Sequence, residues 1–202
     1  MLLLITGASG VGKSSVRARI AAELEPAVRC VELRDLVPIP PLPDLAWRQR
    51  ATEEAVRAAL ELQAEGRHLL LAGDPVAPGE VLAAPSADRL EAVAACLLDC
   101  RPDVQRARLI ARGEPQATLP DHLAFAAWMR EHAADPGHMP EVLTAAGWEE
   151  MRWERWLGWE RGDPRWQVEV IDTGNREIGQ VAAAALAWAT ASLRGETPAF
   201  GG

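Results

Sequence analysis

Hydrophobic and polar positions change in blocks along this chain, with short apolar runs separated by longer stretches of helical periodicity. Short apolar runs are typical of buried strands, and apolar residues recurring every three or four positions indicate amphipathic helices. The predicted strands are Leu2–Thr6, Val28–Leu33, His68–Ala72, Val93–Asp99 and Gln167–Asp172. The predicted helices between and after them are Lys13–Leu24, Leu45–Glu65, Pro102–Arg112 and Arg176–Leu193.

Strands that alternate with helices predict a parallel sheet covered on both faces. With 202 residues, the chain is long enough for one α/β domain with a substantial core. We therefore predict a single three-layer domain over residues 1–202, built on a five-stranded parallel sheet. Residues 35–65 are expected to form a helical segment on the substrate side, and residues 113–166 a helical lid or insertion.

The insertion is rich in tryptophan. It is predicted to hold the helices Asp121–Ala134 and Trp148–Arg161. It carries six of the eight tryptophans, five of which lie toward its C-terminal end: Trp148, Trp153, Trp156, Trp159 and Trp166. In a helix, the spacing of Trp153, Trp156 and Trp159 would put them on one broad face. That face is interpreted either as an aromatic wall over a bound ring or as packing of a lid on the sheet.

A glycine-rich string joins the first strand to the first helix and contains the only lysine of the chain, Lys13. It fits G-x-x-x-x-G-K-[ST], the phosphate-binding loop, in the strand–loop–helix context that the motif requires. Backbone N–H groups and the helix N-terminus then point at one phosphate site, where a compact ammonium fits and a guanidinium does not. The predicted nucleotide-binding residues here are Gly7, Ala8, Ser9, Gly10, Val11, Gly12, Lys13, Ser14 and Ser15.

Carboxylates follow two of the predicted strands. Asp74 comes after the third strand and is predicted to hold Mg²⁺ together with the Ser14 hydroxyl, the alternative being an Asp-Pro turn that caps the strand. Asp35, with Glu32 in reserve, is the predicted base for an acceptor hydroxyl. Both Asp35 and Asp74 are expected near the substrate, because ligands gather at the carboxyl ends of parallel strands.

Arginines supply the remaining candidate chemistry. Arg108 and Arg112 lie four residues apart on one predicted helix face and are candidates for stabilising charge on a transferring phosphoryl group. A solvated helix face is the competing interpretation. Arg48, beside Trp47, is a candidate for holding an anionic or polyhydroxy substrate, and the loop at Thr173 and Gly174 for lining the base side of the nucleotide site.

Composition narrows the class of partner. The net charge of −8 and the lack of a basic stripe argue against nucleic acid, and no apolar stretch is long enough for a membrane span. With no secretion signal recognised at the N-terminus, we expect a cytoplasmic protein. Cys30, Cys96 and Cys100 are expected to be free thiols, and the tail from Gly195 to be frayed.

Taken together, these residues resemble the P-loop small-molecule kinases, the group that includes adenylate, shikimate and gluconate kinases. The resemblance rests on Gly7–Ser14, on Leu97–Val104 running into Arg106–Gly113, and on Ile171–Thr173. It implies that Lys13 grips the terminal phosphates, that Arg108 and Arg112 close over them, and that Thr173 and Gly174 flank adenine. The chain lacks the group's Asp-x-Asp after the second strand and its Asp-Gly-x-Pro at the third.

The sequence thus predicts a kinase that uses ATP and Mg²⁺ and moves the γ-phosphate to a hydroxyl of a small molecule. A sugar acid, a nucleoside or an antibiotic-like metabolite are the candidate acceptors. Two alternatives remain open at this stage. One is a regulatory ATPase or switch that has no small-molecule acceptor, and the other is a degenerate nucleotide binder without turnover.

Overall fold

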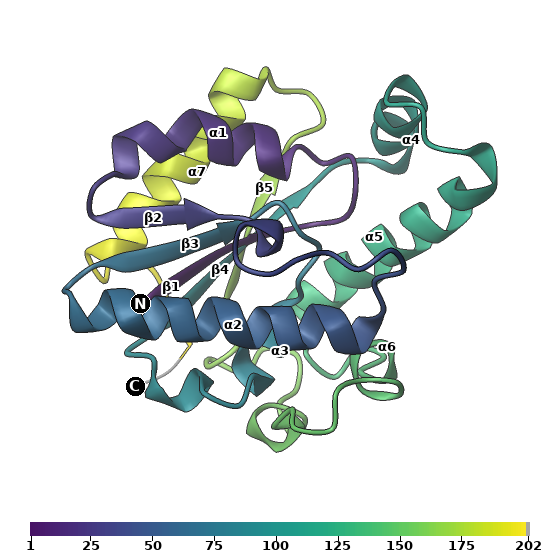
Figure 1. The fold of residues 1–202 in the computed structure, drawn as a ribbon. Coiled ribbons are helices and arrows are strands. Elements are labelled where there is room, and N and C mark those ends of the chain that lie inside the picture. The colour runs from purple at the N-terminus through teal and green to yellow at the C-terminus, as the bar shows by residue number, and fades with distance from the viewer. Residues whose placement is uncertain (201–202) are drawn as a thin grey trace.

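A five-stranded, entirely parallel sheet forms the centre of the protein. The computed structural model describes residues 1–200, and its strands run in the order β2-β3-β1-β4-β5 (Figure 1). Their bounds are β1 Leu2–Thr6, β2 Val28–Val31, β3 His68–Ala72, β4 Val93–Asp99 and β5 Val168–Asp172. The predicted α/β class and five-stranded parallel sheet are therefore confirmed, and β2 ends two residues earlier than expected.

Helices occupy the connections between the strands. The long ones are α1 Lys13–Leu24, α2 Leu45–Ala64, α4 Pro102–Ala111, α5 Leu119–Ala134 and α7 Ile178–Leu193, and the short ones are α3 Pro78–Ala83 and α6 Glu141–Thr144. The five long helices lie within two residues of their predicted bounds, whereas α3 and α6 were not predicted. Within residues 1–200, no helix combines the length and apolar character needed to cross a bilayer.

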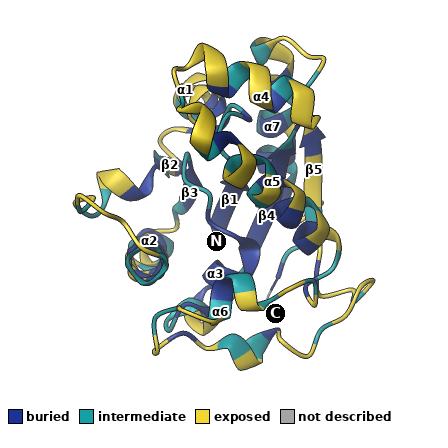
Figure 2. Ribbon diagram, turned by 90° about the vertical axis from the view of Figure 1, so that its right-hand side faces the viewer, coloured by how far each residue is buried: buried dark blue, intermediate teal, exposed yellow. Residues whose placement is uncertain are grey.

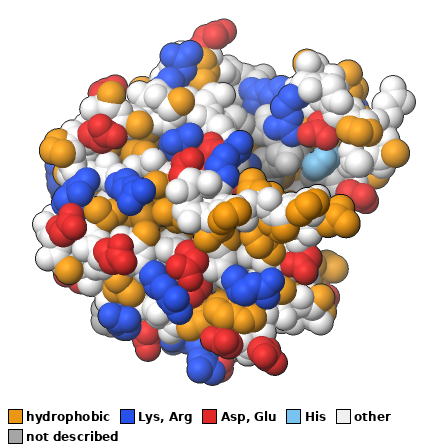
Figure 3. Space-filling model, viewed as in Figure 1, with side chains coloured by type: hydrophobic (Ala, Val, Ile, Leu, Met, Phe, Trp, Pro, Cys, Tyr) orange, Lys and Arg blue, Asp and Glu red, His pale blue; other side chains and the backbone are white. Residues whose placement is uncertain are grey.

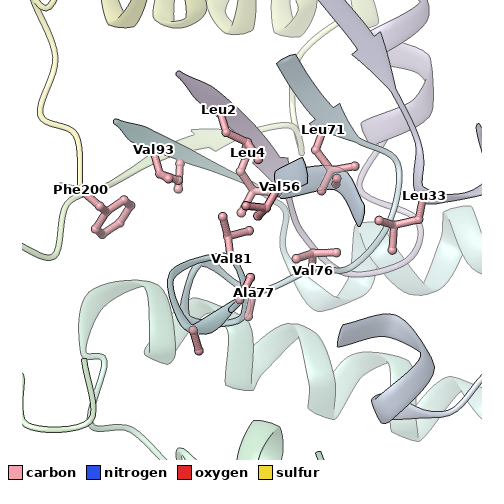
Figure 4. Packing of buried hydrophobic residues seen from close by; sticks show 14 of the residues in the cluster. Leu2, Leu4, Leu33, Val56, Leu71, Val76, Ala77, Val81, Val93 and Phe200 are labelled. Atoms are coloured by element: carbon pink, nitrogen blue, oxygen red, sulfur yellow. The ribbon is translucent and has the colours of Figure 1, made fainter. Parts of the chain in front are cut away.

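The two faces of the sheet are buried by different helices. Alternate side chains of β1 explain the division, because Leu3 and Ile5 pack with α1 and α7, whereas Leu2 and Leu4 pack with α2 and α3. Figure 2 shows β1 and β4 as buried ribbon between helices whose outer surfaces are exposed, whereas the edge strand β5 is largely exposed. Figure 4 shows the second of these clusters, in which Leu71 of β3 and Val56 of α2 meet the β1 leucines.

The helix predicted for Trp148–Arg161 is wrong. The segment is irregular apart from the single 3₁₀ turn Trp153–Arg155, so the three tryptophans do not form a helical face. Trp156 instead points inward, is fully buried and donates its indole N–H to the carbonyl of Gly79 at 2.8 Å. Of the two interpretations of these rings, packing in the core is the one observed. Tertiary burial has overridden the local helical spacing.

The end of the chain also departs from expectation. Phe200 is buried and exchanges two backbone hydrogen bonds with Val93 at the start of β4. The stretch from Gly195 to Phe200 is thus held against the sheet rather than frayed, and the last two residues of that prediction lie outside the described range. The three cysteines are free, as expected, with Cys96 and Cys100 buried and Cys30 half-buried.

His132 of α5 lies at the centre of the tryptophan cluster. Its ring stacks on Trp128 at 4.8 Å between centroids and meets Trp156 and Trp166 edge-on. The side chain is 1% exposed, and neither ring nitrogen has a hydrogen-bond partner within the described residues. Burial, with a smaller contribution from His138, lowers the pKa of His132 from 6.5 to about 4, although Asp135 opposes the shift.

This depressed pKa predicts an acid-sensitive fold. Between pH about 6.5 and about 4 the unfolded chain takes up a proton at His132 and the folded chain does not, so stability falls as the pH drops through that window. The loss should approach about 3 kcal/mol. We expect His132→Phe, which keeps a stacking ring, to flatten the dependence. Urea unfolding of both proteins from pH 7 to pH 4.5 measures the difference; parallel curves would contradict it.

Candidate functional site

The phosphate-binding loop has the backbone geometry that its glycines permit. Gly7 has φ +140° and lies so close to the carbonyl of Leu98 that a Cβ there would collide with it. Gly12 adopts a left-handed conformation, φ 104°, at the N-cap of α1. No side chain caps this end of α1, so the N–H groups of its first turn are left without a side-chain partner. The residues of that turn line the cavity beside the loop. The sequence alone predicted this arrangement.

Lys13 closes the loop from inside. Its Nζ donates to the carbonyls of Gly7 at 2.7 Å and Ala8 at 2.8 Å, and the residue is 5% exposed. Burial lowers the pKa of Lys13 to about 8, with Asp74 and Glu32 opposing the shift and Arg112 adding to it. A buried ammonium held only by carbonyl dipoles is poorly neutralised, and a polyanion beside the loop would neutralise it better.

A cavity of about 490 Å³ opens next to Lys13. Its wall includes the loop from Ser9 to Ser15, and distant parts of the chain add further residues, among them Gly73, Arg108, Arg112, Thr173 and Arg176. Figure 3 shows this face of the molecule hollowed below α4, with Lys and Arg side chains on the rim. Of the predicted nucleotide-binding residues, Ser9 to Ser15, both arginines and Thr173 therefore line one concave and positively charged site, whereas Gly7, Ala8 and Gly174 do not line it.

Arg108 is fixed against the predicted base-side loop. Its Nη1 donates to the Thr173 hydroxyl at 2.9 Å, and its Nη2 donates to the Thr173 carbonyl at 2.6 Å. Arg112 is more exposed and pairs with Glu114 at 2.6 Å. Arg108 thus borders the cavity with its orientation set by Thr173, whereas Arg112 borders it while paired with a surface carboxylate.

The three candidate carboxylates occupy different environments. Asp35 is exposed and accepts from the Glu32 backbone N–H at 2.8 Å, capping a 3₁₀ turn, and it lines neither of the two cavities described here. Glu32 is buried and pairs with Arg17 and Arg34. Asp74 is half-buried, and its Oδ2 accepts from the Leu33 N–H at 2.7 Å. Burial raises the pKa of Asp74, with the backbone hydrogen bond opposing the shift. The base role predicted for Asp35 stays a prediction.

Asp74 faces a second cavity of about 530 Å³, which also contains Arg48. Arg48 donates its Nε to Glu80 at 2.9 Å, and Glu80 is fully buried. The guanidinium lies 5.9 Å from the centre of the Phe125 ring. The predicted substrate residues Arg48 and Asp74 thus share one cavity, which adjoins the first because Pro75 lines both.

Several solved structures share the overall fold of this chain. A sugar kinase from a Janibacter species superposes with TM-score 0.60 at 16% identity, over 94% of each chain. A gluconokinase from Sinorhizobium meliloti superposes with TM-score 0.54 at 17% identity, over 96% of each chain. An uncharacterised protein from Eubacterium ventriosum gives 0.51 at 11% identity, over 93% of this chain and 97% of its own.

The chain has the fold of the P-loop small-molecule kinases. No protein-family profile matches its sequence, and no curated protein does. The likeness therefore lies in the architecture. The resemblance seen in the sequence is confirmed at the level of the fold.

Several residues of this kinase fold were missed from the sequence. Arg19 and Arg176 line the first cavity, and Trp47 and Phe125 line the second. Gln105 of α4 is 1% exposed and donates its side-chain amide to the carbonyl of Ser9 at 2.9 Å, which ties α4 to the phosphate-binding loop. Arg176 lies close to the predicted Thr173 loop and was within reach of sequence reasoning. The others carry no local signal, because distant segments bring them to the site.

The contact between Arg108 and Thr173 gives a test of the nucleotide side of this site. We expect Arg108→Ala to weaken ATP binding by about tenfold, because a preset guanidinium at the cavity wall is lost. Arg106→Ala, at an exposed position on the same helix, is the matched control and should bind normally. Isothermal titration calorimetry in magnesium buffer compares the three proteins. Equal losses in both variants would mean that only general positive charge matters.

Proposed function

We propose that this protein is an ATP- and Mg²⁺-dependent kinase that transfers the γ-phosphoryl group to a hydroxyl of a small molecule. The observation that carries the proposal is the junction of the two cavities. Gly73 and Pro75 line the cavity at the phosphate-binding loop, and Asp74 between them lines the second cavity. A donor phosphate beside Lys13 and an acceptor hydroxyl beside Asp74 would meet at this junction, which favours direct transfer over hydrolysis.

The residues at the loop suit a nucleotide with its metal. Mg²⁺ keeps several waters and takes one or two protein oxygens together with phosphate oxygens, so it needs no cage of protein ligands. Within residues 1–200, no cluster of three or more acidic, cysteine or histidine side chains exists that would bind a metal on its own. Ser14 is exposed and lines the first cavity, and Asp74 stands between Gly73 and Pro75, which line it too. When bound, Mg²⁺ would neutralise charge on the phosphates.

In the proposed reaction, the acceptor oxygen attacks the γ-phosphorus, the bond to the β–γ bridging oxygen breaks, and ADP leaves. Lys13, Arg108 and Arg112 stabilise the charge that develops on the phosphoryl oxygens. The acceptor proton goes to a carboxylate, for which we favour Asp74 over Asp35. Asp74 faces the acceptor cavity, one of its oxygens is held by Leu33, and its pKa is raised, which suits a general base.

Measurement of ADP release tests the proposal and its main alternative together. The protein is incubated with ATP and Mg²⁺, first alone and then with a fractionated pool of small hydroxyl-bearing metabolites. Release of ADP that depends on a metabolite fraction, with appearance of a phosphate ester, is the expected result. Turnover of equal rate without any acceptor would instead support a regulatory ATPase, and no ATP uptake at all would rule out both.

A further inference from the structure

The second cavity has walls that are chiefly apolar. Leu33 lies at its base after β2, Ile39 comes from the proline-rich connector, Trp47 from the start of α2, Phe125 from α5 and Val142 from α6. Figure 3 shows hydrophobic side chains gathered along the connector on this side of the molecule. The volume of about 530 Å³ suits an organic molecule with a ring system, and such cavities take ligands of matching polarity.

Several polar atoms of this cavity already have partners within the protein, including one oxygen of Asp74. The Trp47 indole N–H donates to the carbonyl of Pro38 at 3.3 Å, and the backbone N–H of Trp47 is capped by Asp44 at 2.6 Å. Arg48 gives its Nε to the buried Glu80. Because the rest of the wall is chiefly apolar, a polyhydroxylated ligand would lose its hydrogen bonds to water here and regain few of them, which costs free energy for every unpaired hydroxyl.

The charges of the cavity disfavour an anion. Asp44 and Asp74 line it, and the one arginine in its wall, Arg48, is paired with the carboxylate of Glu80 behind it. A carboxylate ligand would therefore meet two acidic groups and an arginine whose charge is largely balanced. This combination does not suit a sugar acid, although the architecture resembles that of a gluconokinase.

We propose that the acceptor is an uncharged alcohol with an aromatic or alicyclic body, which Trp47 and Phe125 hold while its hydroxyl reaches Asp74. That this ligand accepts a phosphoryl group rests on the proposed kinase function. The chemical class of the ligand follows from the cavity wall alone. Apolar contact with the two rings supplies the binding energy, and the single hydrogen bond to Asp74 sets the orientation.

Saturation-transfer NMR tests the ligand class without requiring turnover. The protein, loaded with Mg²⁺ and the non-hydrolysable analogue adenylyl imidodiphosphate, is mixed with equal concentrations of 3-phenylpropan-1-ol and D-gluconate. We expect transfer to the phenylpropanol protons at least about tenfold stronger than to gluconate. In Phe125→Ser that transfer should fall by at least about tenfold, because truncating a central aromatic contact removes much of the affinity.

Two further variants serve as a second cavity variant and as a control outside the cavities. Ile39→Ser changes a partly exposed residue of the cavity wall and should weaken transfer even if Phe125→Ser folds poorly. Leu42→Ser changes a residue of the same connector that is 89% exposed and lines neither cavity, and it should leave transfer unchanged. Equal or stronger transfer to gluconate, no transfer to phenylpropanol, or transfer that survives in both cavity variants would overturn the inference.

A separate measurement keeps the two proposals apart. Phosphorus NMR of the wild-type protein with ATP, Mg²⁺ and phenylpropanol looks for a phosphate ester. Binding of the alcohol together with ester formation supports both proposals. Binding without an ester, from this or any other alcohol, would overturn the kinase reaction while leaving the ligand class of the cavity intact.

Discussion

Lys13→Ala is expected to lower kcat/KM for phosphoryl transfer by at least about a hundredfold, roughly 3 kcal/mol of transition-state stabilisation. Lys13 is the only lysine, is almost fully buried and is held by the Gly7 and Ala8 carbonyls beside the first cavity. In the proposed reaction this ammonium, already held beside the cavity, stabilises the charge that develops on the phosphoryl oxygens. Steady-state kinetics with a phosphorylated acceptor as product measures the loss.

The same substitution should leave the fold intact. Because burial lowers the pKa of Lys13 to about 8, the unfolded chain holds this proton more tightly than the folded chain between pH about 8 and its ordinary 10.5. Below pH 8 the buried charge therefore costs stability, and removing it should keep or raise the melting temperature without nucleotide. A variant that loses activity because it unfolds would show a lower melting temperature instead.

Lys13→Arg is the matched control for charge. It keeps a cation but enlarges it within a loop that leaves Ala8 and Val11 2% exposed, so we expect it to be nearly as inactive as Lys13→Ala. ATP affinity of the wild-type protein should also weaken above pH about 8, as free Lys13 loses its proton. Full activity in either variant would contradict the assignment of the loop.

Asp74→Asn is expected to lower kcat by about 10²- to 10⁴-fold, the range found for general bases, while KM for the acceptor changes little. Asparagine can still accept from the Leu33 N–H through its carbonyl oxygen, so the local structure should persist. What is lost is the carboxylate that takes the acceptor proton in the proposed reaction. Because burial raises the pKa of Asp74, the wild-type rate should fall as the pH drops toward that raised value.

Asp35→Asn distinguishes the two candidate bases. Asp35 is the last residue of the 3₁₀ turn Leu33–Asp35 after β2. It is exposed, and its carboxylate accepts from the backbone N–H of Glu32. We expect this variant to keep most of its activity and the acid limb of the pH–rate profile, which Asp74→Asn should lose. If Asp35→Asn is the inactive protein, Asp35 is the base, as the sequence first suggested, and Asp74 acts on the metal.

Local sequence was sufficient for the five strands and the five long helices, although not for the short helices α3 and α6. The apolar run Leu2–Thr6 and the spacing of Val16, Ile20 and Leu24 are short-range signals, and both elements appear with their predicted bounds. Local spacing failed in the tryptophan-rich segment, because Trp156 is buried against Gly79, which lies 77 residues earlier in the chain. A residue whose ring lies in the core follows its tertiary contacts rather than its helical periodicity.

By itself the sequence determined the phosphate-binding loop and the parallel sheet that presents it, because a glycine loop between a strand and a helix is a local arrangement. Only the tertiary structure decided which other residues share that site. Asp74, Arg48 and Phe125 meet in one cavity because β3, α2 and α5 converge at the carboxyl edge of the sheet. Contacts between such distant residues depend on how the helices pack over the strands. The spacing of residues along the chain does not predict them.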